Sequence, residues 1–127
     1  SLNLDCVKFA GKQANPYKFV AGADMYISAA RFEPFGLVMV ESLILHVPVL
    51  AVETEATSVI IKNNVNGLIV DNSEEGLYLG LKKILCQKHC LEELKQQALH
   101  YDYAPVNNEV IKTIMKIFDE EGLYEQS

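Results

Sequence analysis

Two glutamates, Glu33 and Glu41, stand on either side of a predicted helix start, in an arrangement that suits a ligand carrying both hydroxyls and phosphate. A buried strand is predicted over 25–28, and a helix is predicted to begin near Gly36. The first N–H groups of a helix lack intrahelical acceptors and carry partial positive charge, so they favour anions. Ionised carboxylates only accept hydrogen bonds, which suits them to sugar and ribose hydroxyls. A sugar nucleotide carries both kinds of group.

A purely structural interpretation accounts for the same residues. Acidic side chains near a helix start are stabilised by the helix dipole, and the exposed face of a helix requires polar residues. Arg31 is the one cation in this loop, and it can meet a phosphate or pair with Glu33. Spacing alone favours the structural interpretation over a ligand site, and it favours the pairing for Arg31.

Length and composition predict one globular domain, since the chain has 127 residues of which 50% are hydrophobic. No apolar run approaches the ~20 residues that a membrane-spanning helix needs, and no secretory or transit segment is visible. The formal net charge of −6 argues against nucleic acid or an anionic membrane as the main partner. An anionic ligand must therefore be held by local donors. Because the chain begins without Met, almost directly on a predicted strand, we expect it to be a fragment of a longer protein.

The three cysteines, Cys6, Cys86 and Cys90, show no disulfide framework. Cys86 and Cys90 lie four residues apart with His89 between them, which offers three local metal ligands. A structural zinc site uses four ligands, and the sequence holds no second cluster. Reduced thiols in a cytosolic protein are therefore the favoured interpretation.

Short apolar runs alternate with helical patterns, which predicts an α/β fold with a Rossmann-like parallel sheet of about four strands and flanking helices. In such a sheet, ligands bind outside the carboxyl ends of the strands, where the loop carrying Glu33 would lie. The expected strands cover 4–9, 25–28, 49–52 and 68–70. Helices are expected after Asn15, over 37–45, before 63, after Ser73, over 91–100 and over 105–121, with a disordered tail over 122–127.

Three positions carry specific backbone predictions. Ser73 is expected to cap the helix that follows it, because acidic residues fill the first turn. His46 is expected to end its helix in a left-handed conformation, which histidine tolerates better than bulky branched residues do. A turn is expected over 64–67, with the Asn66-Gly67 pair well suited to positive φ.

The segment 30–51 resembles the signature of retaining, nucleotide-sugar-dependent glycosyltransferases of the GT-B type. It reads Ala-Arg-Phe-Glu-Pro-Phe-Gly-Leu-Val-Met-Val-Glu, followed by Ser-Leu-Ile-Leu-His-Val-Pro-Val-Leu-Ala. More narrowly, it is similar to the family that includes sucrose-phosphate, glycogen and capsular-polysaccharide glycosyltransferases. The hallmark of that family is two glutamates separated by seven residues, which Glu33 and Glu41 match. The resemblance extends to 15–17 (Asn-Pro-Tyr) and to 66–70 (Asn-Gly-Leu-Ile-Val), in the expected order.

The resemblance implies roles for individual residues. Glu33, as the catalytic residue, would contact hydroxyls of the donor sugar and hold the reacting centre, and Glu41 would bind the ribose hydroxyls. Backbone N–H groups at the helix start would face the diphosphate and stabilise it as it leaves. For Gly11, a turn after strand 4–9 is the favoured alternative. The donor-binding candidates are Glu41, Phe35, Gly36, Leu37, Val38, Arg31, Gly11 and Thr57.

The resemblance further implies that 1–127 is a single domain, the second half of the nucleotide-sugar-binding domain of a two-domain hexosyltransferase. The N-terminal acceptor domain and the basic residues that grip the diphosphate would lie outside this chain, so the chain alone would be inactive. Expected partners are a UDP-, GDP- or ADP-linked sugar and that N-terminal domain, with no nucleic acid and no membrane insertion. The family requires no cofactor and no metal. The implied setting is polysaccharide biosynthesis in the cytoplasm, with the full-length protein peripheral at the inner membrane.

A non-catalytic sugar-nucleotide-binding or scaffold domain remains an alternative. Residues 53–58 depart from the small-residue turn that many relatives of the resembled family have before a short helix, which favours this alternative. Thr57 and Ser58 can cap that helix or bind a sugar or phosphate. The intact Glu33 and Glu41 argue for an active enzyme.

A flavodoxin-like phospho-acceptor domain is the alternative from another class. It would need an aspartate where a strand ends, whereas Asp24 stands where a predicted strand begins. The sequence therefore favours this alternative least.

Overall fold

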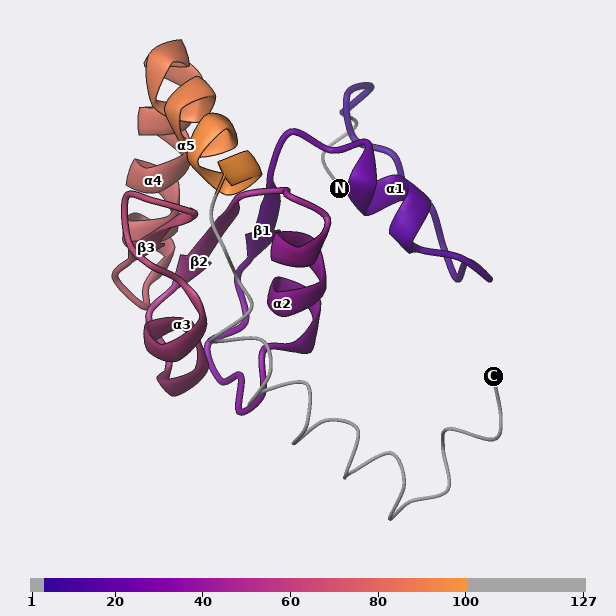
Figure 1. Ribbon diagram of the computed structural model, residues 1–127, viewed down its shortest axis with the longest axis horizontal. Coiled ribbons are helices and arrows are strands. Elements are labelled where there is room, and N and C mark those ends of the chain that lie inside the picture. The colour runs from indigo at the N-terminus through magenta and orange to yellow at the C-terminus, as the bar shows by residue number, and fades with distance from the viewer. Residues whose placement is uncertain (1–3, 101–127) are drawn as a thin grey trace.

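The computed structural model describes residues 4–100, which form three strands and five helices in alternation (Figure 1). The α/β class predicted from the sequence is confirmed. In chain order, the elements are α1 (Tyr17–Ala21), β1 (Tyr26–Ser28), α2 (Leu37–Ile44), β2 (Val49–Val52), α3 (Glu55–Ile60), β3 (Gly67–Val70), α4 (Glu74–Cys86) and α5 (Lys88–His100).

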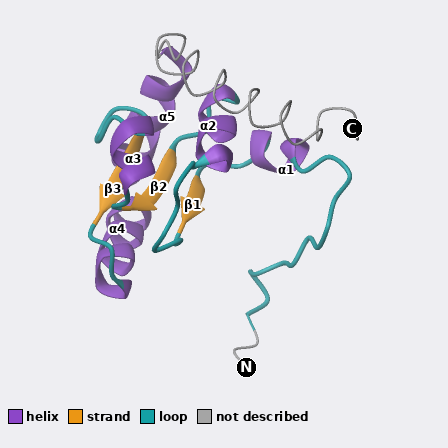
Figure 2. Cartoon of the chain, turned by 90° about the horizontal axis from the view of Figure 1, so that it is seen from below, coloured by secondary structure: helices purple, strands orange, loops and turns teal. Residues whose placement is uncertain are grey.

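The strands form one parallel sheet in the order β1-β2-β3, so each strand lies beside its neighbour in the sequence. Tyr26 stands opposite Val49, and Leu50 stands opposite Leu68. Helices make the crossovers that parallel strands require, with α2 between β1 and β2 and α3 between β2 and β3. All carboxyl ends therefore meet at one edge of the sheet, as the orange arrows in Figure 2 show.

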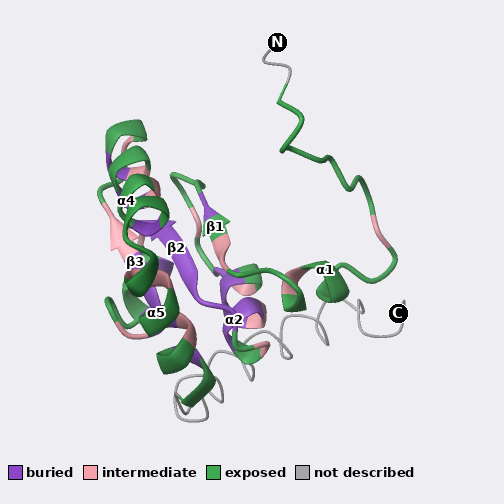
Figure 3. Cartoon of the chain, turned by 90° about the horizontal axis from the view of Figure 1, so that it is seen from above, coloured by how far each residue is buried: buried purple, intermediate pink, exposed green. Residues whose placement is uncertain are grey.

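Helices cover both faces of the sheet, which explains why β2 is apolar and buried along its whole length (Figure 3). Successive residues of β2 point to opposite faces. Val49 and Ala51 pack with α2 and α3, whereas Leu50 packs with α4 and α5. The first core comprises Met39, Val40, Leu43, Val49, Ala51, Ala56, Ile60 and Ile61, and the second comprises Leu50, Leu68, Ile84 and Leu94.

The strand predicted over 4–9 is not formed, so the described sheet has three strands and not about four. Residues 4–12 are all exposed, and Phe9 is 97% exposed. The segment before α1 runs away from the sheet (Figures 1 and 3). A strand needs a partner for its backbone N–H and C=O groups, and no described strand pairs with this segment.

The predicted conformations at Ser73 and His46 are confirmed. The hydroxyl of Ser73 accepts a hydrogen bond from the N–H of Gly76 at 2.9 Å, which caps α4. His46 has a φ of 61°, and its ring Nδ1 lies 3.0 Å from the carbonyl oxygen of Ala98. This contact joins the end of α2 to the last turns of α5.

The turn predicted over 64–67 is confirmed over 64–66, but the positive φ occurs at Asn64, where it is 65°, and not at Asn66 or Gly67. Asn66 is buried, and its side-chain oxygen accepts a hydrogen bond from the N–H of Lys62 at 2.9 Å. Gly67 begins β3 and allows a close approach of strands. A Cβ there would lie 2.3 Å from the carbonyl oxygen of Val49.

Two helix boundaries differ from the sequence prediction. α3 ends at Ile60, before the predicted residue 63, because Ile61 has an extended backbone. α5 begins at Lys88, earlier than the predicted residue 91. The helix predicted over 105–121 and the tail that follows it lie outside the described residues. No helix in the described part of the chain is long and apolar enough to cross a membrane.

Candidate functional site

The loop over 29–36 leaves the carboxyl end of β1 and enters α2 through Gly36. Gly36 has a φ of 64° and a ψ of 33°, a left-handed conformation that glycine adopts readily. A Cβ at this position would lie 2.5 Å from Cε of Met39 and 2.6 Å from Cδ1 of Ile60. The helix start therefore lies directly against the core, with no room for a side chain.

Glu33 folds back onto the start of α2. Its Oε1 accepts hydrogen bonds from the N–H of Phe35 at 3.3 Å and from the N–H of Gly36 at 3.0 Å. Gly36 is the N-cap of α2, so Glu33 closes the turn before the helix, and its charge suits the positive end of the helix dipole. The N–H of Gly36, a predicted phosphate donor, is therefore already engaged. Leu37 and Val38 are the first residues of α2, and their N–H groups have no intrahelical acceptor.

Glu41 lies in the second turn of α2 and is contacted from α1. The hydroxyl of Tyr17 donates a hydrogen bond to Oε1 of Glu41 at 3.2 Å. Pro16 holds the cap position of α1, one residue later than predicted, while the side-chain oxygen of Asn15 accepts from the N–H of Tyr17 at 3.1 Å. No residue of α1 is buried, so polar contacts of this kind matter for its position.

Both glutamates affect the pKa of Tyr26, which lies on β1. Burial raises the pKa of its hydroxyl most, and the negative charge of Glu33 raises it further. A hydrogen bond with Ser28 lowers this pKa, and the charge of Glu41 raises it by a smaller amount. Glu33 is bonded to the N–H of Gly36 just before α2, and Glu41 lies in the second turn of α2, so the structure places the two predicted glutamates on one loop-and-helix unit.

We expect Tyr17 to ionise at a higher pH than a free tyrosine. The negative charge of Glu41 raises the pKa of Tyr17 above 10.0, with smaller contributions from burial and from the hydrogen bond to Glu41. Ultraviolet titration of the protein and of its Glu41→Gln variant, each compared with a Tyr17→Phe version, isolates this hydroxyl. The Glu41→Gln change should return the pKa toward its usual value.

The sign of the accompanying pH dependence follows from the raised pKa. The contribution of Tyr17 to stability is fully present below about pH 10 and is lost as the pH rises through the folded-state pKa. If the titration of Tyr17 were the same in the Glu41→Gln variant, the contact between the two side chains would be contradicted.

Asn72 connects the loops at the carboxyl edge of the sheet, and sequence reasoning missed it. Its Nδ2 donates hydrogen bonds to the carbonyl oxygen of Arg31 at 2.9 Å and to the carbonyl oxygen of Glu53 at 3.1 Å. Asn72 follows β3, Arg31 follows β1 and Glu53 follows β2. The only sequence signal for Asn72 is its place just after a strand, where asparagine is common for reasons of turn formation alone.

Arg31 and Phe35 lie in the same loop as Glu33, as predicted, and both are exposed. Arg31 does not pair with Glu33; the ion pair within residues 4–100 joins Lys95 to Asp24 instead. The favoured structural pairing of Arg31 is therefore not found, and Arg31 is exposed.

Gly11 and Thr57 do not offer free hydrogen-bond donors at the loop over 29–36. Gly11 belongs to the exposed segment before α1, where it has a φ of 66°. Thr57 is buried, and its hydroxyl is used within a capping box at the start of α3. Its Oγ1 accepts from the N–H of Thr54 at 2.7 Å and donates to the carbonyl oxygen of Thr54 at 3.0 Å.

Within the described residues, no group of three or more His, Cys, Asp or Glu side chains is placed to hold a metal ion. Cys86 and Cys90 are both free. The thiol of Cys90 donates a hydrogen bond to Oε1 of Gln87 at 3.2 Å. The arrangement around the start of α5 is therefore that of free thiols with local partners.

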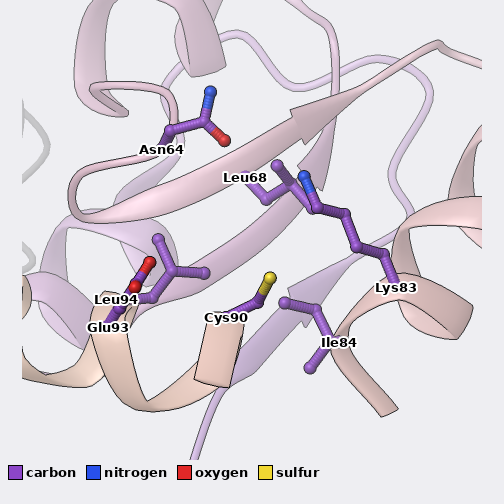
Figure 4. A pocket seen from close by; sticks show the side chains of 7 residues that line it. All are labelled: Asn64, Leu68, Lys83, Ile84, Cys90, Glu93 and Leu94. Atoms are coloured by element: carbon purple, nitrogen blue, oxygen red, sulfur yellow. The ribbon is translucent and has the colours of Figure 1, made fainter. Parts of the chain in front are cut away.

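A cavity of about 130 Å³ lies between β3, α4 and α5 (Figure 4). Asn64 precedes the amino end of β3, and Lys83 lies in the last turn of α4. The cavity is thus at the edge of the sheet opposite to the Glu33 loop and is separate from the candidate site. Its lining residues are Asn64, Leu68, Lys83, Ile84, Cys90, Glu93 and Leu94.

Comparison with known families decides what kind of protein carries this loop. Residues 1–101 match the model of the family described as Glycosyl transferases group 1. The chain belongs to the group 1 glycosyltransferases. The family predicted from segment 30–51 is thereby confirmed.

The chain is also similar to a curated glycosyltransferase and to a solved structure. The chain is 28% identical over 92 residues to the lipopolysaccharide core biosynthesis glycosyltransferase LpsE of Rhizobium meliloti (strain 1021), covering 72% of this chain and 27% of LpsE. The structure of sucrose-phosphate synthase from Thermosynechococcus elongatus has a TM-score of 0.58 with 18% identity, covering 80% of this chain and 27% of that protein. This likeness shows the fold, which matches part of a GT-B enzyme. The chain spans about a quarter of the length of both proteins.

The phospho-acceptor alternative is wrong for this group 1 glycosyltransferase domain. Asp24 precedes β1 at the amino edge of the sheet, and its Oδ1 lies 2.8 Å from Nζ of Lys95. It is a partner in an ion pair and not an aspartate at the carboxyl end of a strand.

Proposed function

We propose that this chain forms the donor side of a retaining hexosyltransferase and binds a nucleotide-diphosphate sugar at the carboxyl end of β1. One observation carries the proposal: Glu33 is bonded to the N–H of Gly36 at the start of α2, and Glu41 lies in the second turn of the same helix. Hydroxyl acceptors and phosphate donors are therefore available within a single turn-and-helix unit.

In this proposal, the start of α2 receives the diphosphate. The N–H groups of Leu37 and Val38 have no intrahelical acceptor, and the helix dipole adds positive potential. Arg31 is exposed in the adjoining loop and supplies the formal positive charge nearby. Such preorganised groups stabilise the negative charge that develops as the nucleoside diphosphate leaves, which is commonly a large part of catalysis.

In this proposal, the two glutamates accept hydrogen bonds from the hydroxyls of the donor. Glu41 has one oxygen bound by the Tyr17 hydroxyl, and a carboxylate can accept several hydrogen bonds, so it can also hold the ribose. Oε1 of Glu33 is held by two backbone N–H groups, which fixes the carboxylate beside the helix start. A carboxylate fixed in this way is suited to orienting the donor sugar. The proposal uses no cofactor and no metal.

The remaining parts of the reaction are assigned to the full-length protein. A chain that covers about a quarter of its relatives leaves room for an acceptor domain, which we propose lies in the same protein. The similarity to a lipopolysaccharide core glycosyltransferase supports a glycan or lipid-linked acceptor and a role in polysaccharide biosynthesis. We place this reaction in the cytoplasm, with the full-length protein at the inner membrane surface.

Calorimetric titration of the full-length protein with UDP-, GDP- and ADP-linked sugars tests the proposal. One nucleotide class should bind saturably, and Glu41→Ala should weaken that binding about 10- to 100-fold, the range for a hydrogen bond to a charged group. Glu92→Ala, at an exposed glutamate of α5, is the control and should bind as the unmodified protein does. Equal affinity of the Glu41→Ala and Glu92→Ala variants would contradict the proposed site.

A non-catalytic sugar-nucleotide-binding or scaffold domain is the second candidate. The observation that favours it is the use of Thr57 within the α3 capping box, which removes a candidate ligand hydroxyl from the site. The two functions differ in turnover. A scaffold would bind the donor without hydrolysing or transferring the sugar, whereas an enzyme would release nucleoside diphosphate.

A further inference from the structure

A single side-chain amide joins the three loops at the carboxyl edge of the sheet. Asn72 donates to the carbonyl oxygen of Arg31 at 2.9 Å and to the carbonyl oxygen of Glu53 at 3.1 Å. Both partners are backbone oxygens, so only the NH₂ group of the amide can make both bonds. The two N–H groups of the amide can therefore donate to one acceptor in the loop after β1 and to one acceptor after β2.

The backbone around Asn72 is held firmly by its neighbours. The N–H of Glu53 donates to the carbonyl oxygen of Val70 at 2.8 Å, which keeps the loops after β2 and β3 together. Ser73 caps α4 through Gly76, and a Cβ at Gly76 would lie 2.3 Å from the carbonyl oxygen of Asp71. Asn72 is itself exposed, and it extends from a hydrogen-bonded turn between β3 and α4.

The loop that Asn72 holds has little packing of its own. Residues 29–32 are exposed, and Phe32 is 85% exposed. Further along, Glu33 bonds the N–H groups of Phe35 and Gly36, which orders the second half of the loop. The bond from Asn72 fixes the first half, two residues before Glu33.

We infer that Asn72 is a positioning residue that holds the loop carrying Arg31 and Glu33 in the conformation needed for transfer. This inference rests on the proposed function. Asn72 need not touch the donor itself, because it acts through the backbone of Arg31. Reacting groups must be held closely for efficient transfer, so a small displacement of this loop costs more in turnover than in donor affinity.

The test uses the full-length protein and the donor identified by calorimetry. Asn72→Asp keeps the shape of the side chain but replaces the two N–H donors with an oxygen that repels both carbonyls. We expect kcat to fall about 10- to 100-fold. The dissociation constant of the donor should change far less, and the N–H groups of Phe35 and Gly36 should exchange with solvent faster.

Asn63→Asp is a matched control for the added charge. Oδ1 of Asn63 accepts a hydrogen bond from the N–H of Ile69 at 3.0 Å, a bond that aspartate can keep. Asn72→Ala removes the donors without adding charge and should show the same loss of kcat as Asn72→Asp. A loss confined to the aspartate variant would assign the effect to charge and overturn the inference.

The inference and the proposed function fail in different ways. If Glu41→Ala weakens donor binding while Asn72→Asp turns over like Asn63→Asp, the positioning role of Asn72 is overturned and the site stands. If Glu41→Ala leaves donor binding unchanged, the proposed site itself is contradicted, and the positioning role falls with it.

Discussion

Replacing Gly36 with alanine should lower the free energy of unfolding by about 2–4 kcal/mol. A left-handed backbone costs a non-glycine residue about 1–2 kcal/mol, and an added methyl group in a filled core costs about 1–3 kcal/mol. Both costs apply here, because Gly36 has a φ of 64° and its Cβ would lie 2.5 Å from Met39 and 2.6 Å from Ile60. Since Gly36 precedes the first turn of α2, donor binding should weaken as well.

Urea unfolding measures the stability effect, and Gly11→Ala is the matched control. Gly11 has a φ of 66°, but no atom lies within 4 Å of the position that its Cβ would take. Its substitution should therefore cost about 1–2 kcal/mol, from the left-handed backbone alone and without a packing effect. Equal losses at Gly11 and Gly36 would show that the close packing at the helix start does not contribute.

Replacing Glu33 with glutamine should reduce kcat of the full-length enzyme about 100- to 1,000-fold, as removal of a preorganised electrostatic group does. The glutamine retains a side-chain oxygen that can accept from the N–H groups of Phe35 and Gly36. The hydrogen bonds that close the turn before α2 should thus remain, while the negative charge beside the donor sugar is lost. The fold should be affected little.

Release of nucleoside diphosphate measures kcat, and thermal unfolding measures the effect on stability. Glu33→Ala removes both the charge and the acceptor, so it should add a loss of stability of about 1 kcal/mol to the loss of turnover. Undiminished turnover in Glu33→Gln would mean that Glu33 serves only to hold the turn before α2.

The parts of the fold that are buried on both faces could be predicted from the sequence. The run over 49–52 is apolar at every position, as a central parallel strand requires, and it forms β2 with the predicted bounds. Ser73 could be predicted because its cap depends only on residues within four positions of it.

Features that depend on distant partners could not be predicted. The run over 4–9 has the composition of a strand, but composition does not reveal whether another strand lies beside it. The role of Asn72 could not be predicted for the same reason, since its hydrogen bonds reach Glu53 and Arg31, which are 19 and 41 residues away. The bond from Glu33 to the N–H of Gly36 is local, yet it depends on the backbone conformation between these two residues, which no sequence pattern specifies.

The most direct measurement of the central claim is a crystal structure of the full-length protein with the nucleoside diphosphate of its donor bound. We predict that phosphate oxygens will accept hydrogen bonds from the N–H groups at the start of α2, and that the ribose hydroxyls will donate to Glu41. A nucleotide bound in the cavity between β3, α4 and α5, or elsewhere away from α2, would contradict the assignment of the donor site.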